Sequence, residues 1–354
     1  MTTTSKNNNS SSRRKQNKPG NRVGLWLMVV CIAAVIAAGC VAIFCLQRHS
    51  GESRWVYVPS GATNGALRDS LCSALGSEQG GRIYTLWRLA DGKVENAHGA
   101  YRVDGGETAL RTARRLKRGA QTPVKATFIG SRTLEDVARR FTANLECDPE
   151  EFLEACNQQL PEAGFKKPEF PAAFLPDTYE VYWTDSGSRL VGRLLRHRNN
   201  FWNDERRTKA SEMGLTPVKI ATIASIVEEE TAKTSERPTV ARLYLNRLQK
   251  GMKLQADPTV KFATGNPKLQ RITGQHLKIE SPYNTYLHAG LPPGPIRVVE
   301  AATLDAVLNA PKHSYIYMCA REDFSGFHNF ASDFATHSEN ARRYQQELNR
   351  RGIR

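Results

Sequence analysis

The pattern of apolar and polar positions separates one long uncharged segment from a series of short periodic ones. The stretch "VGLWLMVVCIAAVIAAGCVAIFCL", residues 23–46, contains no charged side chain. A helix rises about 1.5 Å per residue, so a helix over this stretch is long enough to cross a bilayer. The pattern predicts a single transmembrane helix near the start of the chain.

Beyond this segment, strand-like and helix-like patterns alternate over short distances. The stretch "RWVYVPSGATNGALRDSLCSA" predicts a strand, a turn and an amphipathic helix, because Leu67 and Leu71 are four residues apart. The stretch "HGAYRVDGGETALRTARRLKRG" repeats this order, with a strand at 101–103 and a helix that ends at Gly119. "VKATFIG" and "TLEDVARRFTANL" predict a third unit. The expected fold class is α+β.

Two later segments predict further elements. "FLPDTYEVYW", residues 174–183, predicts a turn followed by a strand, and its aromatic residues suit either a packed core or a platform for sugars. Thr216 and Pro217 are a favourable N-cap and N1 pair for a helix through "VKIATIASIVEEETA". A second helix is expected over 235–250, ended by Gly251.

Charge adds an orientation to this picture. The chain has 354 residues and a formal net charge of +15, and its 40% apolar and 24% charged residues are typical of a folded protein. Residues 1–22 hold six basic side chains and no acid, which leaves +9 for the remainder. We expect a disordered, basic cytoplasmic tail at 1–22, and the positive-inside rule then places the residues after Gln47 outside the membrane.

The apolar segment has two alternative interpretations. A cleaved signal peptide has an apolar core of only about 7 to 15 residues, shorter than the segment seen here. "AAGC" at 37–40 is similar to a lipoprotein cleavage site, but the apolar run continues for six residues beyond Cys40. An uncleaved anchor is therefore expected.

Basic side chains also gather in the second and third strand-helix units. A nucleic-acid surface is one interpretation, but the predicted topology excludes that partner. Lipid head groups and cell-wall polymers are the polyanions available outside the membrane, and an ordinary solvated helix face is the remaining alternative. The residues concerned are Arg111, Arg114, Arg115, Lys117, Arg118, Lys125, Arg132, Arg139 and Arg140.

Cysteine and histidine spacing indicates neither a disulfide framework nor a metal site. Three of the seven cysteines lie in the apolar segment, and four are too few to staple an exported part of this length. No C-x-x-C pair or spaced Cys/His set is present, and no nucleotide-binding loop occurs. We expect no metal and no cofactor.

Three consecutive glutamates, Glu228, Glu229 and Glu230, end the helix that starts at Pro217. At about 100° per residue, Glu230 falls about 20° from Ile223, in the middle of the apolar stripe. By the same measure Glu228 and Glu229 lie about 140° and about 120° away and are expected to face solvent. The periodicity singles out Glu230.

A carboxyl group on an apolar face has two explanations. The helix could end there, or an arginine such as Arg237, Arg242 or Arg247 could pair with Glu230. Alternatively, the apolar surroundings raise the pKa of Glu230, as a glycosidase general acid requires near neutral pH. The helix alone leaves both open.

The residues that follow closely resemble the YceG-like family, the endolytic murein transglycosylases of the MltG type. The resemblance is strong over about 216–300 and weaker over most of the chain after the anchor. It rests on a series of motifs in the family's order: "SIVEEET", "ARLYLNRL", "GMKLQADPTV", "SPYNTY" and "GLPPGPI". The stretch "HNFASDFATHSEN" departs from the family's spacing, which leaves the roles of His328 and His337 unassigned.

The resemblance implies a catalytic residue and a set of residues that bind substrate. The family's catalytic glutamate precedes the threonine of its E-x-E-T element, which is Glu230 here, and Glu228 matches a second family glutamate expected to give hydrogen-bonding support. The motifs that line the family's cleft contain Gln255, Asp257, Thr259, Tyr283, Asn284 and Thr285. Asp257 is also the one nearby candidate for a second catalytic carboxylate, and its position before Pro258 favours a local turn cap instead.

The resemblance also implies a domain order and a function. We expect LysM-like and following small α+β units at 53–145, a connecting region at 146–215 and a catalytic domain at 216–354. The expected activity is cleavage of the MurNAc-β-1,4-GlcNAc bond in nascent peptidoglycan at the outer face of the cytoplasmic membrane, giving 1,6-anhydroMurNAc ends and limiting strand elongation. Expected partners are glycan strands, the membrane and, as further candidates, peptidoglycan synthases. The alternatives are a membrane-tethered muramidase and a non-catalytic wall-binding protein of the LysM kind.

Overall fold

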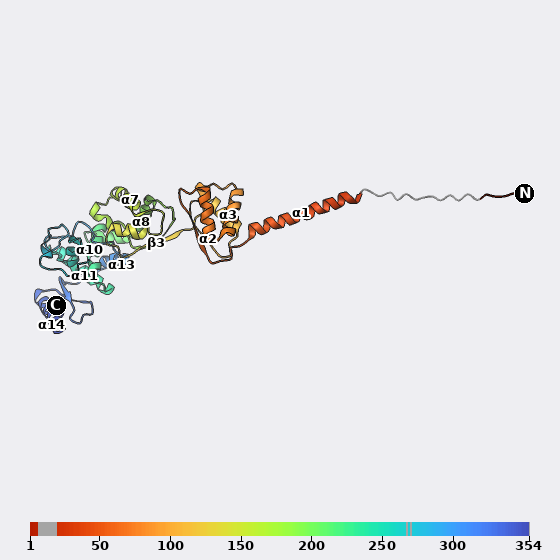
Figure 1. Cartoon of the computed structure of the whole chain (residues 1–354). Helices are drawn as coiled ribbons and strands as arrows, with labels where there is room; N and C mark the ends of the chain where they lie inside the picture. Colours follow the sequence, from red (N-terminus) through yellow and green to blue (C-terminus); the bar gives the residue numbers. More distant parts are fainter. Residues whose placement is uncertain (6–19, 267, 270, 354) are drawn as a thin grey trace. The chain divides into compact units, whose positions relative to one another are not determined.

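The computed structural model describes residues 1–5, 20–266, 268–269 and 271–353 (Figure 1). Most of the predicted cytoplasmic tail, residues 6–19, lies outside the described residues. The chain divides into two compact units, Met1–Gln121 and Thr122–Arg354. Each unit is α+β, as the sequence predicts.

Helix α1, Gly20–Leu46, begins the first unit. Its segment Val23–Leu46 is long and apolar enough to span a membrane, and none of it is buried within the protein. Trp26, for example, leaves 72% of its surface exposed. A large, continuous apolar surface of this kind is unfavourable in water and indicates a membrane or a partner.

The rest of the first unit is one small sheet covered by helices. Strands β1 (Arg54–Val58) and β2 (Gly99–Val103) pair antiparallel, so the first two predicted strand-helix units share one sheet. The helices are α2 (Asn64–Leu75), α3 (Ser77–Leu89), α4 (Val94–Ala97) and α5 (Ala109–Lys117). A Cβ atom at Gly80 of α3 would lie 2.5 Å from the backbone of Leu71, so only glycine allows α2 and α3 to pack this closely.

The second unit starts with a strand pair that is distant in sequence. Strands β3 (Val124–Phe128) and β4 (Asp177–Val181) pair antiparallel. Between and after them lie α6 (Leu134–Phe141), α7 (Pro149–Glu162), the 3-10 helix η1 (Lys167–Ala173), α8 (Gly187–Phe201) and α9 (Asp204–Glu212). The third predicted strand-helix unit therefore belongs to the second compact unit, and the expected boundaries at 145 and 215 do not coincide with the division after Gln121.

The aromatic segment 174–183 forms core. Tyr179 stacks on Phe128 with ring centroids 5.8 Å apart and meets Phe141 edge-on. Phe174 is also fully buried, whereas Tyr182 is exposed. Of the two interpretations of this segment, packing is therefore the one that the structure supports.

A helical cluster forms the centre of the second unit, around α10 (Pro217–Glu230). Thr216 accepts a hydrogen bond from the backbone of Lys219, which confirms the predicted N-cap. Every residue from 220 to 228 is buried. The neighbours of α10 are α11 (Arg237–Gln249), α12 (Asp257–Ala263) and α13 (Ala301–Leu308), while the 3-10 helices η2 (Thr234–Glu236) and η3 (His276–Lys278) connect elements.

The chain ends in a small strand-helix element. Strands β5 (Tyr317–Ala320) and β6 (His328–Ala331) pair antiparallel, and α14 (Phe334–Arg350) contacts both strands. Through Glu236 in η2, β6 is tied to the region that follows α10. This link brings His328 toward the end of that helix.

The nine basic residues between 111 and 140 are divided between the two compact units. Five belong to the first compact unit and four to the second. Arg115, Arg132 and Arg139 form ion pairs with Glu107, Glu229 and Asp136. Attraction of the remaining basic side chains to cell-wall or lipid polyanions stays a prediction.

Candidate functional site

The structure gives the three glutamates of α10 three different environments. Glu228 is 6% exposed, and the side chain of Glu229 is 13% exposed and held by ion pairs, so neither is the freely solvated charge that the helical phase predicts. The reason is that α10 is enclosed on nearly every side by α11, α12 and α13. A stripe of apolar residues predicts exposure only for a helix with one open face.

Glu228 joins α10 to the segment that leads into α13. Its carboxylate lies 3.1 Å from Nη2 of Arg297, and it accepts hydrogen bonds from Thr303 Oγ1 at 2.7 Å and from the backbone N–H of Glu300 at 3.1 Å. Arg237 approaches to 3.9 Å. Glu228 is thus sealed behind the site, where it supports the structure and has no surface for contact with glycan.

Glu229 holds two arginines from distant parts of the chain. Its Oε2 lies 2.6 Å from Nη2 of Arg132, in the connection between β3 and α6, and its Oε1 lies 2.8 Å from Nη1 of Arg297. The side chain of Glu229 is 13% exposed. These two ion pairs fix the wall of the site beside Glu230.

Glu230, the last residue of α10, is the carboxyl group without an arginine. No ion pair to it occurs in the described part of the chain, and its Oε2 is buried without a hydrogen-bond partner there. Arg237 pairs with Glu300, and Arg247 donates to the carbonyls of Ile316 and Leu254. The alternative that an arginine neutralises Glu230 is therefore not what the structure shows.

The surroundings of Glu230 favour its neutral form. Burial raises the pKa of Glu230 to about 7, and the Asp257 carboxylate adds to the rise, while His328, a hydrogen bond from Tyr244 and the charge of Arg247 oppose it. Tyr244 on α11 is itself buried, and burial together with Glu230 raises the pKa of its phenol well above the ordinary value. With a pKa of about 7, a large share of this carboxyl group remains protonated near neutral pH.

A cavity of about 490 Å³ gives Glu230 access to solvent. Asp257, at the first position of α12, faces the same cavity and accepts a hydrogen bond from the Tyr286 hydroxyl at 2.7 Å. The N-cap of α12 is Ala256, which makes no side-chain cap, so the expected turn-capping bond of Asp257 is absent from the described residues. The cavity is lined by Glu229, Glu230, Asp257, Pro258, Lys261, Leu269, Arg271 and Ile272.

Three residues expected in the cleft are buried behind it. Thr259 and Thr285 bond to each other through their hydroxyls at 2.8 Å, and Thr259 also donates to the carbonyl of Ala256. The Asn284 amide donates to the carbonyls of Leu277 and Ile279. With exposures of 0 to 2%, these side chains shape the loop over α12, and the expectation that they contact a sugar does not fit their burial.

The two other expected residues lie at the surface of this region. Gln255 is exposed, and its backbone has a positive φ of 48°, a conformation that non-glycine residues seldom adopt. Tyr283 is partly buried and packs on Phe262 with ring centroids 4.7 Å apart. Both side chains remain candidates for contact with substrate.

The sequence analysis missed Tyr244 and Glu236 and left His328 unassigned. Glu236 accepts from the backbone N–H of His328 at 2.7 Å, and its other oxygen lies 3.0 Å from Nδ1 of the ring. Thr231, directly after Glu230, donates to the same carboxylate. No local sequence pattern predicts this cluster, because β6 lies far along the chain from α10. His337 stacks on Tyr317.

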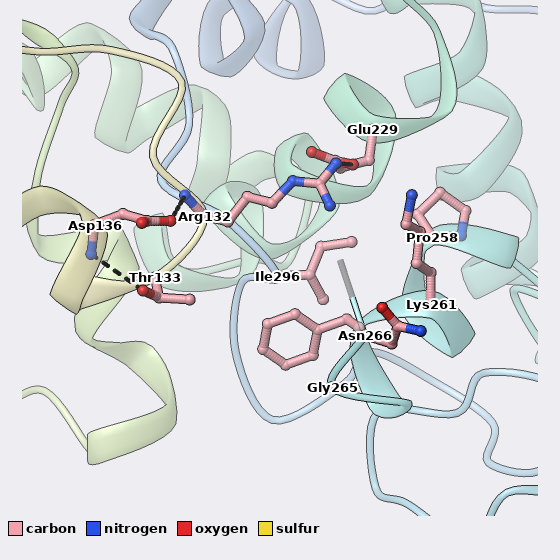
Figure 2. Close-up of a pocket in the computed structure, with 10 residues that line it drawn as sticks. Arg132, Thr133, Asp136, Glu229, Pro258, Lys261, Gly265, Asn266 and Ile296 are labelled. Atoms are coloured by element: carbon pink, nitrogen blue, oxygen red, sulfur yellow. Dashed lines mark hydrogen bonds and ion pairs between the residues drawn. The ribbon is translucent and has the colours of Figure 1, made fainter. Parts of the chain in front are cut away.

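A second cavity, of about 450 Å³, adjoins the first (Figure 2). Glu229, Pro258 and Lys261 line both cavities. Figure 2 shows Arg132 pointing toward Glu229, with Lys261 of α12 across the cavity. Its lining is completed by Thr133, Asp136, Phe262, Gly265, Asn266 and Ile296.

The described residues contain no cluster of three or more His, Cys, Asp or Glu side chains that could hold a metal ion.

Comparison with known proteins gives consistent matches. The model of the YceG-like family matches residues 56–343. An endolytic murein transglycosylase of Bacillus subtilis is 26% identical over 298 residues, which cover 78% of this chain and 81% of that protein. One of Streptococcus pneumoniae is 31% identical over 149 residues, 41% of this chain and 27% of that protein.

A solved structure shows the same fold. The crystal structure of a yceG-like protein from Listeria monocytogenes superposes with a TM-score of 0.52 at 22% sequence identity. The match covers 81% of this chain and 98% of that one.

Proposed function

The chain belongs to the YceG-like family, and from that premise we propose that it is an endolytic murein transglycosylase. It cleaves glycan strands of peptidoglycan and is a lyase. The observation that carries the proposal is the state of Glu230: one carboxyl group, raised to a pKa of about 7, with a buried oxygen that has no partner among the described residues, at the edge of a cavity. An acid that is still protonated near pH 7 suits protonation of a leaving oxygen.

Glu230 serves both halves of the reaction. It first gives its proton to the bridging oxygen between N-acetylmuramic acid and N-acetylglucosamine, and the bond from the muramyl C1 to that oxygen breaks. The muramyl C6 hydroxyl then attacks C1 and gives its proton to Glu230. The product end is 1,6-anhydroMurNAc, no water is consumed, and the acid is regenerated.

Asp257 supports a second candidate, a muramidase. A retaining glycosidase uses a second carboxylate, and an inverting one uses it to hold a water. Asp257 faces the cavity of Glu230. Among the described residues, its side chain makes no turn-capping hydrogen bond. In the transglycosylase, Asp257 raises the pKa of the acid and hydrogen-bonds Tyr286, without attacking C1.

The product of digestion in heavy-oxygen water distinguishes the two enzymes. The detergent-solubilised full chain is incubated with glycan strands in this water, and the masses of the product fragments are measured by mass spectrometry. A transglycosylase gives unlabelled ends that are lighter than hydrolysed ends by one water. Labelled reducing ends would establish a muramidase, and absence of any cleavage would leave a wall-binding protein.

The other parts of the chain have supporting roles in this proposal. The helix Val23–Leu46 anchors the protein in the cytoplasmic membrane, with the following residues on the outer side. The small sheet and helices of residues 54–117 form a LysM-like unit that holds glycan, and residues 216–354 form the catalytic domain. Synthases of peptidoglycan are candidate partners, because the anchor keeps the site close to newly made strands.

A further inference from the structure

The second cavity starts one residue from the proposed acid. Glu229 lines both cavities, and Pro258 and Lys261 of α12 form the rest of their shared wall. A group bound in the second cavity can therefore be continuous with a sugar bound at Glu230. The part of the substrate that enters it must branch from the sugar close to the bond that breaks.

The charges around the second cavity leave one cation available. Glu229 is paired with Arg132 and Arg297, and Asp136 is paired with Arg139 and also accepts from the backbone N–H of Arg132. The two acids are thus already neutralised by arginines. The Lys261 ammonium, in contrast, has no hydrogen bond or ion pair to any residue that the structure describes. An anionic group of a ligand would give it a partner.

The remaining lining combines apolar surface with one hydroxyl and one amide. Phe262 and Ile296 offer apolar surface, Thr133 carries the hydroxyl, and Asn266 offers the N–H groups of a side-chain amide whose oxygen accepts from the backbone N–H of Lys268. Few of the groups available are suited to the many hydroxyls of a second sugar ring. Apolar surface, an amide and a lone ammonium together suit a short peptide with small side chains and free carboxylates.

We propose that this second cavity binds the acidic peptide that N-acetylmuramic acid carries, and that the enzyme thereby prefers peptide-bearing glycan to bare glycan. The inference rests on the proposed function. The peptide is joined through the lactyl group on O3 of the same ring whose C1 is cleaved, so it leaves the sugar beside the acid. Lys261 then pairs with a peptide carboxylate, while Phe262 and Asn266 contact the peptide chain.

The test compares two substrates with the full chain. One is peptide-bearing glycan, and the other is the same material after an amidase has removed the peptides. The measured quantity is the ratio of kcat/KM for the two substrates, because a general catalytic defect lowers both values and leaves the ratio unchanged. Lys261→Met keeps the length of the side chain and removes its charge. We expect it to lower the ratio about tenfold, as the loss of one charge-assisted contact would.

A second variant and two controls complete the design. Asn266→Trp fills the cavity without altering a charge and should lower the ratio by a similar factor. Lys268→Met removes an exposed lysine outside both linings and should leave the ratio unchanged. Unchanged ratios for both Lys261→Met and Asn266→Trp would overturn the inference while cleavage by the wild type still supports the proposed function. If the wild type cleaves neither substrate, the proposed function itself fails.

Discussion

At the scale of single residues, the site shows how position within one helix turn changes the chemistry of identical side chains. Glu228 and Glu229 are held by arginines, whereas Glu230 is half-buried, its Oε2 is fully buried, and it forms no ion pair with any residue that the structure describes. An arginine near a carboxylate stabilises its charge, and burial without such a partner disfavours the charge. Burial raises the pKa of Glu230 to about 7, which suits proton donation near neutral pH.

Replacement of the proposed acid is the first prediction at this scale. Glu230→Gln keeps the shape of the side chain and removes the proton that can be transferred, so kcat for glycan cleavage should fall by about 10³-fold or more. Cleavage is measured by the release of soluble glycan fragments. The matched control is Glu212→Gln on an exposed part of α9, which should retain full activity. Equal losses in the two variants would show that Glu230 has no special role.

The second prediction concerns pH. Glu230 acts as an acid, so kcat/KM should decline as pH rises through about 7, where the proton is lost. The Asp257 charge raises the pKa of Glu230, and its removal lowers that pKa. Asp257→Asn should therefore shift the basic limb of the profile to lower pH while activity at low pH is largely retained. The amide oxygen of the asparagine can still accept the hydrogen bond from the Tyr286 hydroxyl.

The same variant tests the role of Asp257. If Asp257→Asn is as inactive as Glu230→Gln at every pH, Asp257 takes part in bond formation or activates water. The enzyme would then be the muramidase.

At the scale of secondary-structure elements, α10 is positioned by buried polar contacts as well as by apolar packing. Glu228 connects it to Arg297 and to Thr303 of α13, and Ser225 accepts a hydrogen bond from the backbone N–H of Ile296 at 3.0 Å. These contacts hold the segment 296–300 against the helix that carries the acid. They fix the orientation of Glu230 without touching it.

The third prediction tests this coupling. Glu228→Ala removes one side of a buried ion-pair network and should lower the free energy of unfolding by about 3 kcal/mol. Denaturant unfolding of the full chain, followed by tryptophan fluorescence, measures the change. As a control, Glu205→Ala breaks an exposed pair with Lys209 on α9 and should leave the midpoint nearly unchanged. A small effect of Glu228→Ala would mean that apolar packing alone positions α10.

At the scale of the whole molecule, the chain has two compact units, and the first includes an exposed apolar helix. The exposed apolar surface of α1 and the basic residues before it favour insertion with the N-terminus inside. In the proposed topology, the tether restricts the enzyme to glycan close to the membrane. This location fits an enzyme that acts on strands as they are made.

The fourth prediction follows from this topology. Protease added to spheroplasts should remove residues 54–354 and leave the anchor and tail protected. Detection with tags at the two ends measures the result. A control with intact cells shows that the outer layers block the protease. Protection of the C-terminal tag in spheroplasts, or a mature protein that begins at Cys40 with lipid attached, would contradict the uncleaved anchor.

The sequence by itself determined the features that depend on neighbouring residues. The apolar run of α1, the N-cap at Thr216, the strand at 101–103, which extends to Gly99 in the structure, and the helices that follow the turns all arise from local periodicity and capping, and the structure confirms them. The choice of Glu230 also came from the phase of one helix and from a local motif. The buried Oε2 of Glu230, which has no hydrogen-bond partner among the described residues, is consistent with that choice.

Only the tertiary structure decided the features that depend on contacts between distant segments. β3 pairs with β4 about 50 residues later, and His328 of β6 lies near the end of α10 through Glu236. Neither contact can be predicted from the local pattern of apolar and polar residues. The burial of Glu228 and Glu229 was mispredicted for the same reason, because the periodicity of a helix shows which face is apolar but not how many faces its neighbours cover. The raised pKa of Glu230 belongs to this second group, since it comes from burial by neighbouring elements and from the charge of Asp257 on α12.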